Sequence, residues 1–143
     1  MADTSVLLGE LLRASGRARL SDQRLELFIS AHAWSEFTHE LPRRIAAFAR
    51  RHELAADQEA LLMQVCLDAV GANIGLVEEA VYAPVEDEAR SRSLLDPDDW
   101  PQVACALVLD AGIWTLDNDF LGTGIATWTT DSLRQWLERN RPE

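Results

Sequence analysis

Residues 96–112 (DPDDWPQVACALVLDAG) and 113–120 (IWTLDNDF) decide the fold class. The first stretch predicts a helix, because Asp98 or Asp99 offers an N-cap and Gly112 provides a C-terminal stop. The second stretch begins with an apolar run that predicts a short buried strand, and carboxylates follow this run at once. A helix that leads into a buried strand is typical of an α/β fold.

The rest of the chain continues this alternation of helices and apolar strands. Helices are predicted over residues 6–12, 57–70, 78–93 and 131–140, and Asp131 is expected to cap the last of them. Another helix is predicted from about residue 31 onward, and Pro42 is expected to interrupt or restart it. Strands are predicted over residues 25–30, 73–77 and 125–128. The strands are nearly all apolar, which indicates a parallel sheet that helices bury on both faces. We therefore expect one α/β domain over residues 1–143.

The charge of the chain is unusual in amount and in composition. The 143 residues carry a net charge of −11, which argues against nonspecific binding of nucleic acid at long range. All thirteen basic residues are arginine, whose planar guanidinium binds phosphate through paired hydrogen bonds. They include two clusters, Arg13, Arg17 and Arg19, and Arg43, Arg44, Arg50 and Arg51. A locally basic binding face and an ordinary solvated helix face are both compatible with these clusters.

The cysteines and the hydropathy pattern indicate the compartment. Cys66 and Cys105 are too few and too scattered for a disulfide framework or a zinc site, and their aliphatic neighbours predict small buried thiols. No apolar stretch approaches the roughly 18 residues that span a bilayer, and no leader-like segment is recognisable. We expect a cytoplasmic protein that has no contact with membranes.

Carboxylates from four separate stretches are expected at one edge of the sheet, beyond the carboxyl ends of its strands. They are Asp3, Glu36, the group Asp96, Asp98 and Asp99, and the pair Asp117 and Asp119. Each has an ordinary explanation as a helix cap, a solvated helix residue or a turn residue. Together, without matching basic residues, they would repel one another unless a hard divalent cation lay between them. Oxygen ligands of this kind suit Mg²⁺ or Mn²⁺.

Four stretches, in this order, resemble the motifs of the PIN domain, a family of metal-dependent ribonucleases that includes the toxins of bacterial toxin–antitoxin pairs. They are ADTSVLL (2–8), FISAHAWSEFTHEL (28–41), DPDDWPQVACAL (96–107) and IWTLDNDF (113–120). The resemblance implies a three-layer sandwich with a central, mostly parallel sheet flanked by helices. It also implies a homodimer and, for a toxin, an antitoxin protein as partner.

The resemblance assigns roles to residues at matching positions. The implied catalytic residues are Asp3, Glu36, Asp99 and Asp117, and the implied metal ligands are Asp3, Asp99, Asp117 and Asp119. The implied supporting residues are Thr4 or Ser5 beside Asp3, Thr115 orienting Asp117, Asp96, and Glu40 as a weaker alternative to Glu36. The implied reaction is hydrolysis of phosphodiester bonds in single-stranded RNA with Mg²⁺ or Mn²⁺ as cofactor. Arg43 and Arg44 would then contact the RNA.

The chain departs from the family at its first motif. Only Met1 and Ala2 precede Asp3, where the family has a buried central strand that ends in the first acid. We therefore expect a truncated first strand, with either a true start upstream or another segment, such as a partner chain, covering the middle of the sheet.

Two other classes of function compete with the ribonuclease. One is a catalytically inactive PIN-like interaction protein, for which the five tryptophans offer aromatic surface or core. The other is a different acidic α/β enzyme, such as a metal-dependent phosphatase. In such a phosphatase, a second Asp is expected two residues after the nucleophilic Asp. This chain has Ser5 at that position, which counts against the phosphatase.

Overall fold

The computed structural model describes residues 1–140, so the domain predicted over residues 1–143 is described except for its last three residues. Its strands are β1 (Leu27–Ser30), β2 (Ile74–Val77), β3 (Ile113–Trp114) and β4 (Thr127–Trp128). Its helices are α1 (Thr4–Leu11), α2 (Ala14–Leu20), α3 (Ala31–Arg51), α4 (Ala56–Asn73), α5 (Glu79–Tyr82), α6 (Glu86–Arg92), α7 (Trp100–Val108) and α8 (Thr130–Arg139). Three short 3-10 turns are η1 (Ala83–Val85), η2 (Pro97–Asp99) and η3 (Asn118–Phe120).

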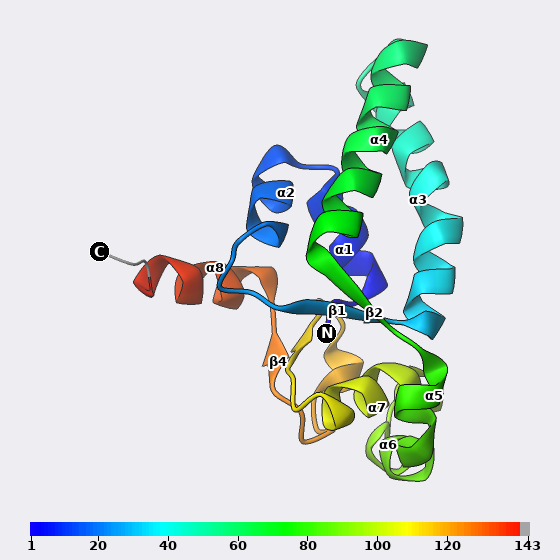
Figure 1. The fold of residues 1–143 in the computed structure, drawn as a ribbon, viewed down its shortest axis with the longest axis vertical. Coiled ribbons are helices and arrows are strands. Elements are labelled where there is room, and N and C mark those ends of the chain that lie inside the picture. Colours follow the sequence, from blue (N-terminus) through cyan, green and yellow to red (C-terminus); the bar gives the residue numbers. More distant parts are fainter. Residues whose placement is uncertain (141–143) are drawn as a thin grey trace.

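The strands form two parallel pairs, β1 with β2 and β3 with β4. Helices α1 to α4 lie on one side of them and α5 to α7 on the other (Figure 1). The predicted α/β class and the parallel pairing are therefore confirmed. The predicted three-layer sandwich with a single central sheet is not confirmed, because the strands form two pairs rather than one continuous sheet.

Residues 1–3 lie between the two strand pairs and bond to both. The Ala2 N–H donates to the Phe28 carbonyl at 2.8 Å, and the Asp3 N–H donates to the Trp114 carbonyl at 2.9 Å. The Trp114 N–H in turn donates to the Met1 carbonyl at 2.7 Å. The sequence predicts a truncated first strand at this place. In the structure, these three residues pair with backbone groups of β1 and β3.

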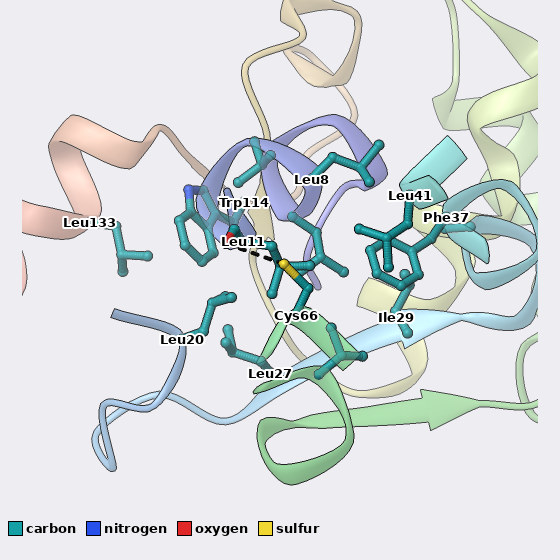
Figure 2. Packing of buried hydrophobic residues seen from close by; sticks show 14 of the residues in the cluster. Leu8, Leu11, Leu20, Leu27, Ile29, Phe37, Leu41, Cys66, Trp114 and Leu133 are labelled. Carbon is teal, nitrogen blue, oxygen red and sulfur yellow. Dashed lines mark hydrogen bonds between the residues drawn. The ribbon is translucent and has the colours of Figure 1, made fainter. Parts of the chain in front are cut away.

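Two hydrophobic cores cover opposite faces of the strands. Trp114 packs into the core formed with α1 to α4, whereas its neighbour Ile113 packs into the core formed with α5 to α7. Successive residues of a strand point to opposite faces, so an apolar run supplies both cores. Figure 2 shows the first core, in which Cys66 lies among leucines and its thiol donates to the Leu11 carbonyl at 3.5 Å.

Both cysteines are buried and free, which confirms their prediction as small buried thiols. Burial raises the pKa of the Cys66 thiol and raises the pKa of Cys105 to about 12. Among residues 1–140, the helices are too short or too polar for any of them to traverse a bilayer.

Three helical segments differ from their predictions. Helix α2 was not predicted, because it buries only Gly16 and Leu20 and shows no apolar periodicity. Pro42 does not interrupt α3, whose 21 residues run through it, because Pro42 faces solvent and water can reach the backbone group that it leaves unpaired. The helix predicted over residues 78–93 is instead divided into α5, η1 and α6, at the turn that contains Pro84.

Two predicted N-caps are also corrected. Thr129, rather than Asp131, caps α8, since the Thr129 hydroxyl accepts the Ser132 N–H at 3.1 Å. Ahead of α7, Asp96 accepts the Asp98 N–H at 2.9 Å and caps η2. Asp98 therefore lies within this turn, and Asp99 precedes α7 at the N-cap position, where its side chain makes no capping hydrogen bond.

Gly16 allows α2 to pack closely against α1. A Cβ atom at this position would overlap the backbone carbonyl of Glu10, whereas a Cβ at Gly9 within α1 would meet open space. We expect Gly16→Ala to lower the free energy of unfolding by about 1–3 kcal/mol, as overpacked sites do. Gly9→Ala should raise it by about 0.5–1 kcal/mol, through a smaller loss of chain entropy. Urea unfolding of both variants checks this, and equal effects would contradict the proposed close contact.

Candidate functional site

A small cleft lies at the carboxyl ends of the strands, where three segments distant in sequence meet. Its volume is about 70 Å³, and Asp3, Glu36 and Asp99 all line it. Asp3 follows the residues bonded to β1 and β3, Glu36 lies in the second turn of α3, and Asp99 precedes α7. The cleft continues into a wider groove along α3, lined by His32, Glu36 and Asp99 among others.

The Asp3 carboxylate is held by two hydroxyl groups. The Ser5 hydroxyl donates to Asp3 Oδ2 at 2.8 Å, and the Thr115 hydroxyl donates to the same oxygen at 2.9 Å. Thr115 is buried, and its hydroxyl oxygen also accepts the Asp117 N–H at 2.9 Å. The Thr4 hydroxyl is directed elsewhere, to the Ala33 carbonyl. Thr115 therefore couples the position of Asp3 to that of the turn that begins at Asp117.

The turn after β3 brings a second group of carboxylates together. Asp117 Oδ1 accepts the Asp119 N–H at 2.9 Å, which fixes the start of η3. Carboxylate oxygens of Asp96, Asp99 and Asp119 lie within 4.8 Å of one another. Hard cations such as Mg²⁺ and Mn²⁺ favour such oxygen-only sets. Asp99 is the residue that this group shares with the cleft.

The electrostatics of the site converge on Asp99. Its carboxyl group is half-buried, and its pKa is raised from the ordinary 3.8 to about 6, with desolvation as the largest cause. The negative charges of Asp96, Asp117, Asp3 and Asp119 contribute further to the raised pKa of Asp99. The ionised form of Asp99 is therefore disfavoured when no cation is bound, and a divalent cation would stabilise it.

The predicted site residues divide into those near the cleft and those elsewhere. Asp3, Glu36 and Asp99 line the cleft, and Asp96 and Asp119 join Asp99 in the close carboxylate group. Asp117 is near enough for its charge to act on Asp99.

The remaining predicted residues lie farther along α3. Glu40 pairs with Arg43, with Oε1 and Nη1 3.3 Å apart, and Arg44 lines a separate groove between α1 and α3. No described contact ties these three residues to the carboxylate cleft.

Sequence reasoning missed two buried polar residues that support the cleft. Gln102 is only 6% exposed, and its side-chain amide donates to the Ala2 carbonyl at 3.0 Å. Its amide oxygen accepts from the Ser30 hydroxyl at 3.5 Å, and Ser30 also caps α3 by accepting the Ala33 N–H. Gln102 thus links α7 to residues 1–3 and to the end of β1. The signal for it was a lone amide inside the apolar helix WPQVACALV.

The fold and the site together define an α/β domain with a carboxylate-lined cleft at the carboxyl ends of its parallel strands. A family model described as PIN domain matches residues 1–138, so the chain belongs to the PIN domain family. This confirms the resemblance noted from the four motifs. PIN domains are generally nucleases and generally use a divalent metal. Comparison with curated proteins gave no match.

The raised pKa of Asp99 predicts a pH-dependent stability. Because its native pKa of about 6 exceeds the ordinary 3.8, the native state binds more protons than the unfolded state between these values. The contribution of Asp99 to stability is therefore present at low pH and is lost as the pH rises through about 6. We expect Asp99→Asn to raise the melting temperature of the metal-free protein at neutral pH, and to raise it less in acid.

Asp68→Asn is the matched control, because Asp68 is exposed on α4 and the substitution makes the same change in charge. Thermal unfolding in a chelator, at acidic and neutral pH, checks the prediction. Equal stabilisation by both substitutions would show that net charge alone is responsible.

Proposed function

We propose that this PIN domain is a metal-dependent endoribonuclease that hydrolyses phosphodiester bonds of single-stranded RNA. The observation that carries this proposal is the position of Asp99, which is half-buried and shared by the cleft and the close carboxylate group. Four neighbouring acids act on it and raise its pKa. Such an arrangement is unfavourable by itself and becomes favourable when a cation is bound.

The donor chemistry fits Mg²⁺ or Mn²⁺. Asp96, Asp99 and Asp119 would hold the cation, since their oxygens already lie within 4.8 Å of one another, and Asp3 and Asp117 add charge nearby. A bound cation of this kind supplies positive charge that lowers the pKa of water and offsets charge developing on a phosphate.

The chain's own residues shape the rest of the site. Ser5 and Thr115 fix the Asp3 carboxylate, so this group cannot turn away from the cleft without losing two hydrogen bonds. Glu36 adds an exposed carboxylate to the α3 side of the cleft, facing the wider groove through which a strand of RNA would enter. The predicted contacts of Arg43 and Arg44 with RNA belong to the same proposal. The toxin role, the antitoxin partner, the homodimer and the cytoplasmic location stay predictions.

Titration with Mn²⁺ and an RNA cleavage assay test the proposal together. We expect Mn²⁺ to raise the melting temperature, because a ligand that binds only the folded state stabilises it. At a free Mn²⁺ concentration of a hundred times Kd, the free energy of unfolding rises by about 2.7 kcal/mol. Cleavage of single-stranded RNA should require Mn²⁺ or Mg²⁺. Asp99→Asn should abolish the thermal shift and lower the cleavage rate by at least about 100-fold.

Asp68→Asn should leave both the thermal shift and the cleavage unchanged. Cleavage that persists in a chelator would contradict the proposed mechanism. Binding of Mn²⁺ without any cleavage of RNA would instead favour the alternative of an inactive PIN-like interaction protein.

Thr115 offers a separate test of how the acids are positioned. Thr115→Val removes the hydroxyl that donates to Asp3 and accepts from Asp117, whereas Thr115→Ser keeps both hydrogen bonds. We expect the valine variant to bind Mn²⁺ about 10–100-fold more weakly, as is usual when a group that orients ligands is lost. The serine variant should bind Mn²⁺ within a few-fold of the original chain. Calorimetric titration measures both affinities, and equal affinities would show that Thr115 has no part in positioning the acids.

A further inference from the structure

A basic groove lies between α1 and the second half of α3, away from the carboxylate cleft. Its volume is about 550 Å³, and the residues that define it are Leu12, Arg13, Arg44, Phe48, Arg51 and His52. We infer that this groove binds a segment of single-stranded RNA that is continuous with the strand in the cleft. This deepens the proposed function and rests on it.

The arginines of this groove differ from most others in the chain. Six arginines outside the groove are paired with acids, as Arg19 is with Glu10, Arg24 with Asp22 and Arg92 with Glu88. Among the other arginines outside the groove that the structure describes, Arg17, Arg50 and Arg139 have no ion pair. Within residues 1–140, Arg13, Arg44 and Arg51 take part in no ion pair. The chain has 24 acidic and 13 basic residues, so acids to pair with are plentiful. Three unpaired guanidinium groups around one groove therefore point to an anion from outside the chain.

Helix α3 connects this groove to the cleft. Glu36, Glu40, Arg44, Ala47 and Arg51 are spaced four, four, three and four residues apart, so they share one face of the helix. At 1.5 Å per residue, Arg44 lies about 12 Å from Glu36 along the axis and Arg51 about 22 Å. Glu40, the one acid between them, is paired with Arg43. A strand that follows this face from the cleft would therefore reach the unpaired arginines.

The floor of the groove favours RNA over an acidic protein segment. The rings of Phe48 and His52 lie with centroids 4.2 Å apart and planes inclined by 35°, and His52 is exposed. Exposed aromatic rings beside arginines are the usual platform for unstacked bases, because every base has a face that can stack. An acidic peptide would also satisfy the guanidinium groups, but its carboxylates have no flat aromatic face to stack on these rings.

Binding is tested in a chelator, so that no cleavage is needed, by fluorescence anisotropy with oligouridylate RNA. Inorganic polyphosphate and polyglutamate of matching charge serve as competitors. We expect Arg44→Gln and Arg51→Gln each to reduce the slope of log K against log salt by about 0.7, the value for one phosphate contact on a single strand. Arg50→Gln is the matched control: it makes the same change in charge next to Arg51, but Arg50 does not line the groove.

His52→Ala separates stacking from charge, since it should weaken RNA binding several-fold and leave polyphosphate binding unaltered. An effect of Arg50→Gln equal to that of Arg51→Gln would overturn the inference, because bulk charge would then explain the binding. Polyphosphate competing as well as RNA would overturn the assignment to RNA. Tighter binding of polyglutamate would overturn it in favour of an acidic protein segment.

The test separates this inference from the proposed nuclease activity. Cleavage of RNA with no dependence of binding on Arg44 or Arg51 would reject the groove alone. Groove-dependent binding of RNA with no metal-dependent cleavage would reject the nuclease and retain the binding site.

Discussion

Three backbone hydrogen bonds made by residues 1–3 determine the geometry of the site. They hold this short segment between β1 and β3, so that Asp3 emerges where both neighbouring strands end. Gln102 reinforces the arrangement by donating to the Ala2 carbonyl, which ties α7 to the same segment. Asp99, at the start of α7, is thereby held at a set distance from Asp3. The cleft depends on this junction, because residues 1–3 bond to β1, β3 and α7, the elements that lead to its walls.

The molecule separates its charges along α3. Carboxylates gather at the end nearest the strands, where desolvation and then mutual repulsion raise the pKa of Asp99, and unpaired arginines gather toward the other end. The fold tolerates the repulsion because the backbone junction and the buried hydroxyl of Thr115 leave the acids little freedom to move apart. Such preorganisation lowers the stability of the free protein and strengthens the binding of a cation that neutralises the acids.

The sequence predicted the strands and long helices because each contains recognisable apolar positions, as β1 and α4 do. It did not predict α2, whose place is set by the close approach of Gly16 to Glu10 and by the ion pair of Arg19 with Glu10. These are contacts between helices, and no local pattern encodes them. The cap of α8 was missed for a related reason, since Asp131 is by type a better cap than Thr129 and only the course of the backbone selects Thr129.

The sequence could predict which acids belong to the candidate site, but not how their carboxylates are arranged in space. Motif order identified Asp3, Glu36, Asp99 and Asp117, whereas the turns around Asp96 and Asp117 decide which oxygens come close together. These turns bring Asp96, rather than Asp3, into the closest group with Asp99 and Asp119. Similarly, the sequence could not choose between Thr4 and Ser5 as the partner of Asp3. Both follow it directly, and the choice depends on the first turn of α1.

The two buried thiols have a practical consequence. Cys66 and Cys105 are inaccessible, and their raised pKa values keep them in the unreactive thiol form, so alkylating reagents can reach them only when the core opens. The rate at which they are modified therefore measures the opening of the domain. A single cysteine introduced at an exposed position such as residue 50 would carry a fluorophore without competition from either native thiol.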